Sequence, residues 1–189
     1  MAHPRPSPES GPFRADQLRD GDRYELSHGH PIYRAPARRE RAAPNIAGAT
    51  VIDTDPEVAW AGVDAGFSSE PGTLCAPDVA VAAPTDASLS VTSWLTIAPP
   101  LAVAYAGQGQ DEADLRLKIA ELLEAGTRFV WVVRLRGPQR VEVHRPDGPM
   151  RLFTAGEVLE APSILRNPVP VPALFDRETA HEGMLRHLL

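Results

Sequence analysis

The sequence predicts an α/β or α+β fold in which helices flank a mixed β-sheet. One observation is an apolar run at 101–106 (LAVAYA), which has the length and composition of a strand buried on both faces. Another is the segment 111–125, whose apolar side chains recur at helical spacing until Gly126. The third is a β-branched and aromatic run at 128–135. A crossover of this length makes the two strands parallel.

The first half of the chain gives weaker patterns. They predict a helix over 13–20, strands over 23–26 and 31–35, a short helix over 44–47 that Pro44 opens, and a strand over 78–82. Residues 1–12 are expected to form a flexible arm. The stretch 50–76 stays open, with strand candidates at 58–63 and around Phe67.

The second half continues the sheet. Residues 140–144 alternate as a half-buried strand does, and a turn at Asp147-Gly148 leads into a further strand at 151–153. A proline-rich stretch, 167–172, is expected to cover the surface, and 177–188 to form a terminal helix. Residues 13–189 are therefore predicted to be a single domain.

Composition limits the function classes. No apolar run reaches the roughly 18–20 residues that cross a bilayer, and the polar N-terminus does not resemble a signal peptide, so we expect a cytoplasmic protein with no membrane partner. The net charge of −6 argues against a protein that coats nucleic acid, although a local basic cleft fits it. Cys75 is the only cysteine and is expected to be buried; no Cys/His cluster has zinc spacing.

One lysine on the predicted helix stands out. The apolar stripe of this helix consists of Leu115, Ile119, Leu122 and Leu123. Lys118 lies on the flank of the stripe beside Leu122, with Asp114 one turn before it. The lysine either extends into solvent and pairs with Asp114, or it has a role in a site.

Two further features lie near strand ends. Pro77-Asp78 begins a predicted strand, where the aspartate either caps the chain or serves as a ligand. The LAVAYA run opens into Gly107-Gln108-Gly109-Gln110 and then a helix, which is a favourable place for an active site.

These features in this order resemble the Uma-two type of restriction endonuclease, a branch of the PD-(D/E)xK nuclease superfamily, from residue 24 to 176. The matching pieces are Tyr24-Glu25-Leu26 with Gly29, Pro77-Asp78-Val79, Pro100-Leu101-Ala102-Val103, Lys118 with Gly126, Val130-Trp131-Val132-Val133, Val141-Glu142-Val143 and Pro170-Val171-Pro172-Ala173-Leu174-Phe175. The spacing from 104 to 118 to 126 to 131 is the most specific part. The resemblance implies a restriction-endonuclease-like fold.

The resemblance also implies a Mg²⁺-dependent, or Mn²⁺-dependent, endonuclease that hydrolyses DNA. Asp78 would be the first metal ligand and the backbone carbonyl of Tyr105 another. Lys118 would stabilise charge on the phosphate, having moved from the strand to the helix. Glu25 and Asp114 would be peripheral acids. Many nucleases of the superfamily act as pairs, so a homodimer is a further expectation.

The sequence departs from the family at its central acid. Val103-Ala104-Tyr105 stands where the family has glutamate, and alanine offers no ligand, so a metal would bind weakly or not at all. Two explanations stay open. The chain is either a natural pseudo-nuclease that binds nucleic acid or protein without cutting, or an engineered Glu→Ala form that traps an inactive enzyme.

The remaining candidates carry weaker signals. Arg34, Arg38, Arg39 and Arg41 form a basic cluster. It is either a solvated face or an edge where Arg38, Arg39 and Arg41 contact the phosphates of nucleic acid. His28, His30 and His144 are interpreted as surface or turn residues, and Trp60, Trp94 and Trp131 as core or loop anchors.

Overall fold

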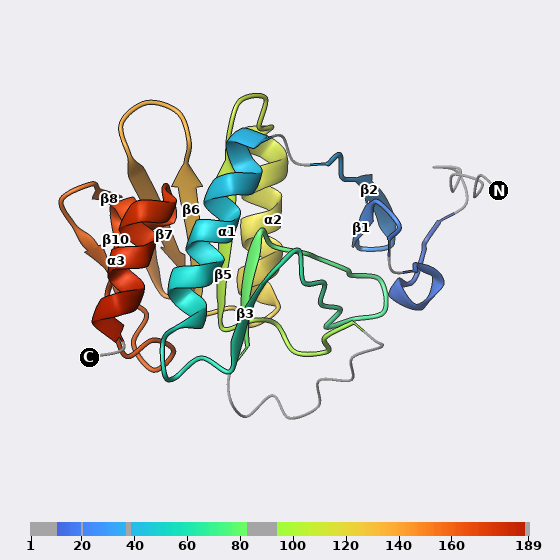
Figure 1. The fold of residues 1–189 in the computed structure, drawn as a ribbon. Coiled ribbons are helices and arrows are strands. Elements are labelled where there is room, and N and C mark those ends of the chain that lie inside the picture. The colour runs from blue at the N-terminus through green and yellow to red at the C-terminus, as the bar shows by residue number, and fades with distance from the viewer. Residues whose placement is uncertain (1–10, 20, 37–38, 83–93, 188–189) are drawn as a thin grey trace.

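The frame of the molecule is a six-stranded sheet in the order β3-β4-β5-β6-β7-β8 (Figure 1). This computed structural model describes residues 11–19, 21–36, 39–82 and 94–187. The strands are β3 (Trp60–Val63), β4 (Val79–Ala82), β5 (Leu101–Ala106), β6 (Phe129–Arg134), β7 (Arg140–Arg145) and β8 (Gly148–Thr154). Strands β5 and β6 are parallel and all other neighbours are antiparallel, which confirms the predicted mixed sheet.

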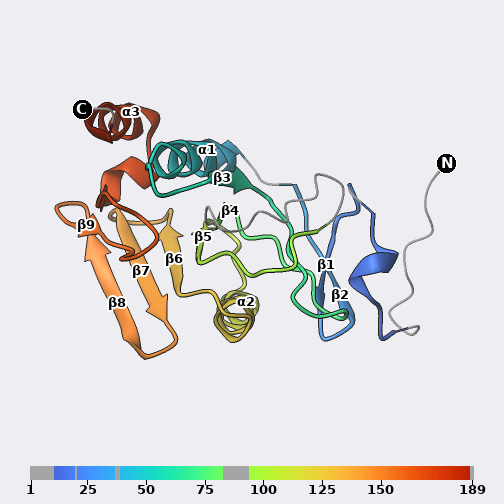
Figure 2. The ribbon, with the colours of Figure 1, turned by 90° about the horizontal axis from the view of Figure 1, so that it is seen from below.

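Helices cover both faces of the sheet (Figure 2). Helices α1 (Arg39–Asp53) and α3 (Arg177–His187) lie on one face, and α2 (Glu112–Glu124) lies on the other. Side chains of β5 alternate between the two cores. Leu101, Val103 and Tyr105 pack with α1, whereas Ala102, Ala104 and Ala106 face α2. Small side chains on this second face let the helix backbone lie close to the strand.

Helix α2 forms as the sequence predicted. The Asp111 carboxylate caps it by accepting the backbone N–H groups of Ala113 and Asp114 at 2.8 and 3.1 Å. Gly126 follows the helix with a φ of 109°, a conformation that favours glycine. The apolar stripe faces the sheet, with Leu115, Ile119 and Leu122 buried.

A small hairpin stands beside the sheet. It consists of β1 (Tyr24–Ser27) and β2 (His30–Tyr33), preceded by the short 3-10 helix η1 (Ala15–Gln17) in place of the longer helix expected there. Backbone hydrogen bonds of 2.8 and 3.0 Å join Leu26 to Leu74. The Trp94 indole donates to the carbonyl of Ala15 at 3.3 Å. The first contact attaches β1 to the segment that contains Leu74, and the second attaches η1 to the segment that contains Trp94.

The short helix expected to open at Pro44 is part of a longer helix. Helix α1 covers Arg39–Asp53, and Pro44 lies inside it instead of opening a short helix. Proline in a helix removes one hydrogen bond, but burial of Val51 and Ile52 against the sheet outweighs that local penalty. The strand candidate around Phe67 does not form, because Phe67 makes only isolated bridges to Cys75 and Leu95, although its side chain is buried.

The proline-rich stretch near the end is also not a surface cover. Val169 and Val171 are buried in the core. Strand β10 (Val169–Pro170) pairs with β9 (Val158–Leu159), and the 3-10 helix η2 (Val171–Leu174) follows. Proline and valine alternate in this stretch, and the valines face inward. The prolines, which have no backbone N–H to donate, occupy the positions between them.

Other sequence predictions have mixed outcomes. Trp131 is fully buried and Trp94 is a loop anchor, as expected. The predicted arm falls on residues 1–10, outside the described residues, and on Gly11 and Pro12. The single-domain prediction stays a prediction. Within the described ranges, no helix combines the length and apolarity needed to cross a bilayer.

Truncating Leu122 should destabilise the protein. Its side chain is 1% exposed, so Leu122→Ala should lower the free energy of unfolding by about 2–4 kcal/mol, measured by urea titration. Leu117 on the same helix is 46% exposed, and Leu117→Ala should cost within about 0.5 kcal/mol. Equal losses in the two variants would contradict the assignment of the buried face.

Candidate functional site

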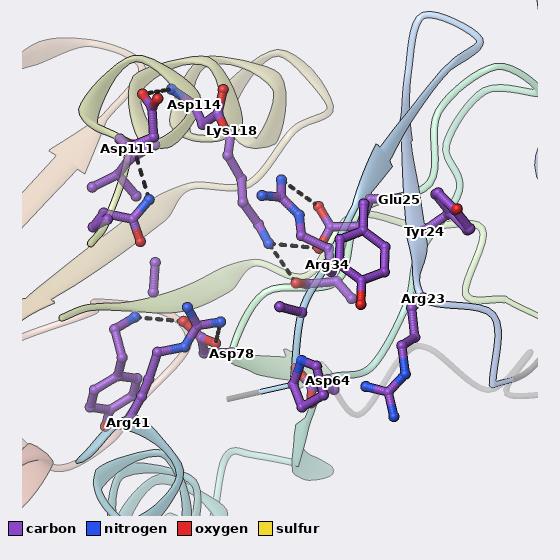
Figure 3. Close-up of a pocket in the computed structure, with 18 of the residues that line it drawn as sticks. Arg23, Tyr24, Glu25, Arg34, Arg41, Asp64, Asp78, Asp111, Asp114 and Lys118 are labelled. Carbon is purple, nitrogen blue, oxygen red and sulfur yellow. Dashed lines mark hydrogen bonds and ion pairs between the residues drawn. The ribbon is translucent and has the colours of Figure 1, made fainter. Parts of the chain in front are cut away.

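A pocket of about 750 Å³ lies between the β1–β2 hairpin, the start of α1, the β4–β5 pair and α2 (Figure 3). The predicted site residues that line it are Glu25, Arg41, Asp78, Ala104, Tyr105, Asp114 and Lys118. The structure thus brings together three side chains from distant parts of the sequence, Asp78, Ala104 and Lys118. Their chemical roles stay predictions.

Strand register explains why Asp78 and Ala104 meet. Val79 of β4 pairs with Val103 of β5, and continuing this antiparallel register by one residue sets Asp78 opposite Ala104. The backbone N–H of Tyr105 donates to Asp78 Oδ2 at 2.6 Å. A buried N–H group needs an acceptor. Because Asp78 precedes the first residue of β4, its carboxylate takes the place of a strand carbonyl as the acceptor for this N–H of β5. The aspartate therefore has a structural role between the two strands, and its role as a metal ligand stays a prediction.

The other oxygen of Asp78 is held by helix α1. Arg41 Nη2 lies 2.9 Å from Asp78 Oδ1, and Asn45 Nδ2 donates to the same oxygen at 3.4 Å. Both carboxylate oxygens are therefore engaged by protein donors (Figure 3). The cluster ties α1, β4 and β5 together at the floor of the pocket.

Lys118 reaches across the pocket from α2 to the hairpin. Its Nζ lies 2.9 Å from Glu25 Oε1 and donates to the carbonyl of Ala76 at 2.6 Å. Arg34 Nη2 holds the second oxygen of Glu25 at 3.0 Å. The side chains of Lys118 and Glu25 are only 16% and 10% exposed. Lys118 is thus not a solvated stem, and its ion-pair partner is Glu25 rather than Asp114.

Charges around the pocket shift several pKa values. Burial tends to lower the pKa of Lys118, but Cys75, Glu25 and Asp78 act in the opposite direction and the net pKa is raised. Burial raises the pKa of the Cys75 thiol to about 12. Partial burial and the nearby charge of Asp78 raise the pKa of the Asp64 carboxyl. Asp64, at a φ of 53°, lies in the stretch that the sequence left unassigned.

The donor set does not fit the Mg²⁺ that the resemblance implies. Mg²⁺ requires oxygen ligands in a near-octahedral arrangement. Ala104 supplies none, and the oxygens of Asp78 and Glu25 are held by Arg41, Lys118 and other protein donors. Among the residues that the structure describes, no group of three or more His, Cys, Asp or Glu side chains could hold a metal.

The pocket wall carries more acids than bases. Its acidic side chains are Asp22, Glu25, Glu40, Asp64, Asp78, Asp111 and Asp114, and its basic side chains are Arg23, Arg34, Arg41 and Lys118. The basic side chains Lys118, Arg34 and Arg41 contact the two inner acids. With seven acidic and four basic side chains the wall is net negative, so a phosphate is attracted only where a basic side chain is accessible.

Two described members of the predicted basic cluster, Arg34 and Arg41, line the pocket. Arg41 turns into the pocket onto Asp78, Arg39 is exposed at the start of α1, and Arg38 lies outside the described residues. The histidines do not converge. His28 lies 3.6 Å from Glu121 and His144 lies 3.6 Å from Glu142, on different elements.

The sequence missed a second group of basic residues. Arg134, Arg136 and Arg140 line a smaller hollow next to the pocket, beyond the loop that follows β5. Arg134 forms ion pairs with Glu112 at 2.6 Å and Glu142 at 2.8 Å, and these acids raise its pKa. Basic residues scattered along a strand and a turn give no local motif, so only the tertiary structure reveals the group.

The structure places the chain in the class of mixed α/β proteins in which helices flank a six-stranded sheet. The family model described as Uma2, putative restriction endonuclease, matches residues 13–170. The chain belongs to this family.

A solved structure supports the same fold. It is described as a putative nuclease belonging to DUF820 from Anabaena variabilis, and it superposes with a TM-score of 0.72 over 89% of this chain and 99% of that chain. The sequence identity is 19%, so this likeness concerns the fold alone. No protein of curated function matches the chain.

Breaking the Lys118–Glu25 pair should destabilise the fold. Glu25→Gln leaves two cations without a carboxylate, and we expect a loss of about 1.5–3 kcal/mol in the free energy of unfolding by urea. Glu124→Gln, an exposed change on α2, is the matched control and should be nearly neutral. A loss no larger than that of the control would contradict the pairing.

Alkaline pH should remove the contribution of Lys118. Because its folded-state pKa is raised above the ordinary value of 10.5, its charge stabilises the fold fully below that pH. The contribution is lost as pH rises through the raised pKa. The stability difference between wild type and Lys118→Met, measured by urea unfolding, should therefore shrink above that value. A difference that stays constant or grows would contradict the raised pKa.

Proposed function

We propose that the chain is an impaired nuclease that binds nucleic acid, with DNA as the first candidate, and does not cut it. The single observation that carries the proposal is the ion pair of 2.9 Å between Arg41 and Asp78, opposite an alanine at position 104. The guanidinium neutralises the carboxylate that a catalytic metal would need.

Metal binding at this place would be costly. A divalent ion would have to displace Arg41 and Asn45 from Asp78 while the Tyr105 N–H keeps the other oxygen. Arg41 is 37% exposed, so solvent screens its loss in part, but Asp78 is 9% exposed and would lose a charged partner. Without a second carboxylate at position 104, too few negative oxygens remain to offset this cost and the dehydration of Mg²⁺.

Lys118 is committed in the same way. Its two contacts, to Glu25 and to the carbonyl of Ala76, hold the ammonium away from solvent. Stabilising the charge that develops on a scissile phosphate would require a free, preorganised donor. The two parts of the reaction that the resemblance implies, metal activation and charge stabilisation, are therefore both weakened.

The arginines at the pocket support nucleic-acid binding. The side chains of Arg34 and Arg41 line the pocket and are 32% and 37% exposed, so part of each guanidinium remains accessible beside its ion pair. Guanidinium groups form strong charge-assisted hydrogen bonds with phosphate. Contact of DNA with Arg38 and Arg39, a homodimer and a cytoplasmic location remain expectations of the same proposal.

The natural residue at position 104 decides the origin of the impairment. Glutamate in the natural gene would make this chain an engineered inactive form of an enzyme. Alanine there would make it a natural pseudo-nuclease, a binding module for nucleic acid or protein.

The test is a plasmid-nicking assay beside gel retardation of labelled DNA and RNA. Wild type should retard nucleic acid at low salt and should not nick the plasmid in Mg²⁺ or Mn²⁺. Calorimetric titration should show that Ala104→Glu gains divalent-ion binding, because it adds the missing carboxylate, whereas the uncharged control Ala104→Gln does not.

Each outcome has a distinct meaning. Divalent-dependent nicking by wild type, abolished in Asp78→Ala, would overturn the impairment. Failure to retard DNA or RNA would overturn nucleic-acid binding and favour a protein partner. Nicking by Ala104→Glu but not by wild type would support the proposal. It would also show that the lack of a glutamate at position 104 disables the site.

A further inference from the structure

A second hollow of about 450 Å³ adjoins the pocket at the end of β5. We call its basic wall, Arg134, Arg136 and Arg140, the arginine shelf. The loop Gly107-Gln108-Gly109-Gln110 lines both the hollow and the pocket. The shelf and the proposed site are therefore two parts of one continuous surface.

The three arginines differ in how far their charge is compensated. Arg134 is neutralised by two acids, Glu112 and Glu142. Arg136 has one acidic neighbour, Glu40, at 3.3 Å, and its side chain is 57% exposed. Arg140 Nη1 donates to the carbonyl oxygens of Arg136 and Pro138 at 2.6 and 3.3 Å.

Arg140 is thus held by main-chain oxygens instead of an acid. No ion pair of Arg140 occurs within the ranges that the structure describes. Main-chain carbonyls fix the direction of a guanidinium without cancelling its charge, so its remaining donors are preorganised for an anion. The glutamate at the shelf wall, Glu112, is already paired with Arg134.

We propose that the arginine shelf, through Arg136 and Arg140, holds phosphates of a nucleic-acid strand that passes over the loop from the mouth of the pocket. This inference rests on the proposed function and adds the place where the polyanion is held. The pocket has an excess of acids, whereas in the hollow Arg140 has no acidic partner among the described residues, and the Arg136–Glu40 pair is exposed enough for a phosphate to compete with Glu40. A phosphate backbone gains most where positive charge is uncompensated.

The loop between the two places suits such a path. Gly109 has a φ of 79°, and a Cβ placed on it would meet no atom within 4 Å. A nucleic-acid strand can therefore lie close to the protein backbone at Gly109. The side chain of Arg136 also contacts Gln108 of the loop, so the shelf and the loop are joined.

The experiment uses the full chain and a fluorescent single-stranded DNA of about 16 nucleotides. Anisotropy titrations over a range of salt give the slope of log K against log salt. Arg136→Ala/Arg140→Ala should weaken binding to all sequences and reduce the slope by about 1.4, the value for two lost phosphate contacts on single strands. Arg145→Ala/Arg151→Ala removes the same charge from exposed positions on β7 and β8 and should leave the slope at the wild-type value.

A charge-retaining variant separates a phosphate contact from a structural role. Arg136→Lys/Arg140→Lys should keep most of the wild-type slope, because lysine still neutralises phosphates. Its folding, and that of both alanine doubles, is checked by urea unfolding. Loss of the slope in the lysine variant as well would overturn the phosphate contact.

The remaining outcomes distinguish the two proposals. If wild type binds DNA and both alanine doubles lower the slope equally, the shelf is overturned while the proposed function stands. If wild type binds neither DNA nor RNA, both are overturned. If Arg136→Ala/Arg140→Ala lowers the salt slope and Arg145→Ala/Arg151→Ala does not, the inference is supported.

Discussion

The carboxylate of Asp78 is the contact on which the pocket depends. It accepts the Tyr105 N–H at 2.6 Å and pairs with Arg41 at 2.9 Å, so one side chain joins β4, β5 and α1. The same residue that the family resemblance makes a metal ligand is here a structural acceptor. Its position is fixed by the Tyr105 backbone and by the side chains of Arg41 and Asn45, so this wall of the pocket needs no contribution from a side chain at position 104.

Charge is distributed unevenly around the end of β5. The pocket collects acids from the hairpin, α1 and α2, whereas the shelf collects bases from β6, β7 and their connection. With a net charge of −6, the chain as a whole repels polyanions, so any contact with nucleic acid depends on local positive potential. The glycine-containing loop marks the boundary between the two environments.

The periodic second half of the chain was predictable, and the site was predictable only in part. LAVAYA gave β5 with the predicted bounds, and the helix stripe placed Lys118 on the edge of α2. The partner of Lys118, Glu25, lies 93 residues away and could not be inferred from helical spacing. Pro44 led to the wrong helix start, because burial of α1 against the sheet outweighs the local penalty of a proline. The burial of Val169 and Val171 was not predicted, because the prolines between them suggested a surface segment.

Ala104 occupies a wall of the pocket, beside the other two residues of the resemblance. Its side chain is only 6% exposed and belongs to the core that β5 forms with α2, so a longer side chain has to be accommodated between strand and helix or directed into the pocket. An acid at this position would also lie opposite Asp78 in the strand register. The size and charge of residue 104 therefore set both how closely α2 approaches β5 and how much negative charge gathers at this end of the strand pair.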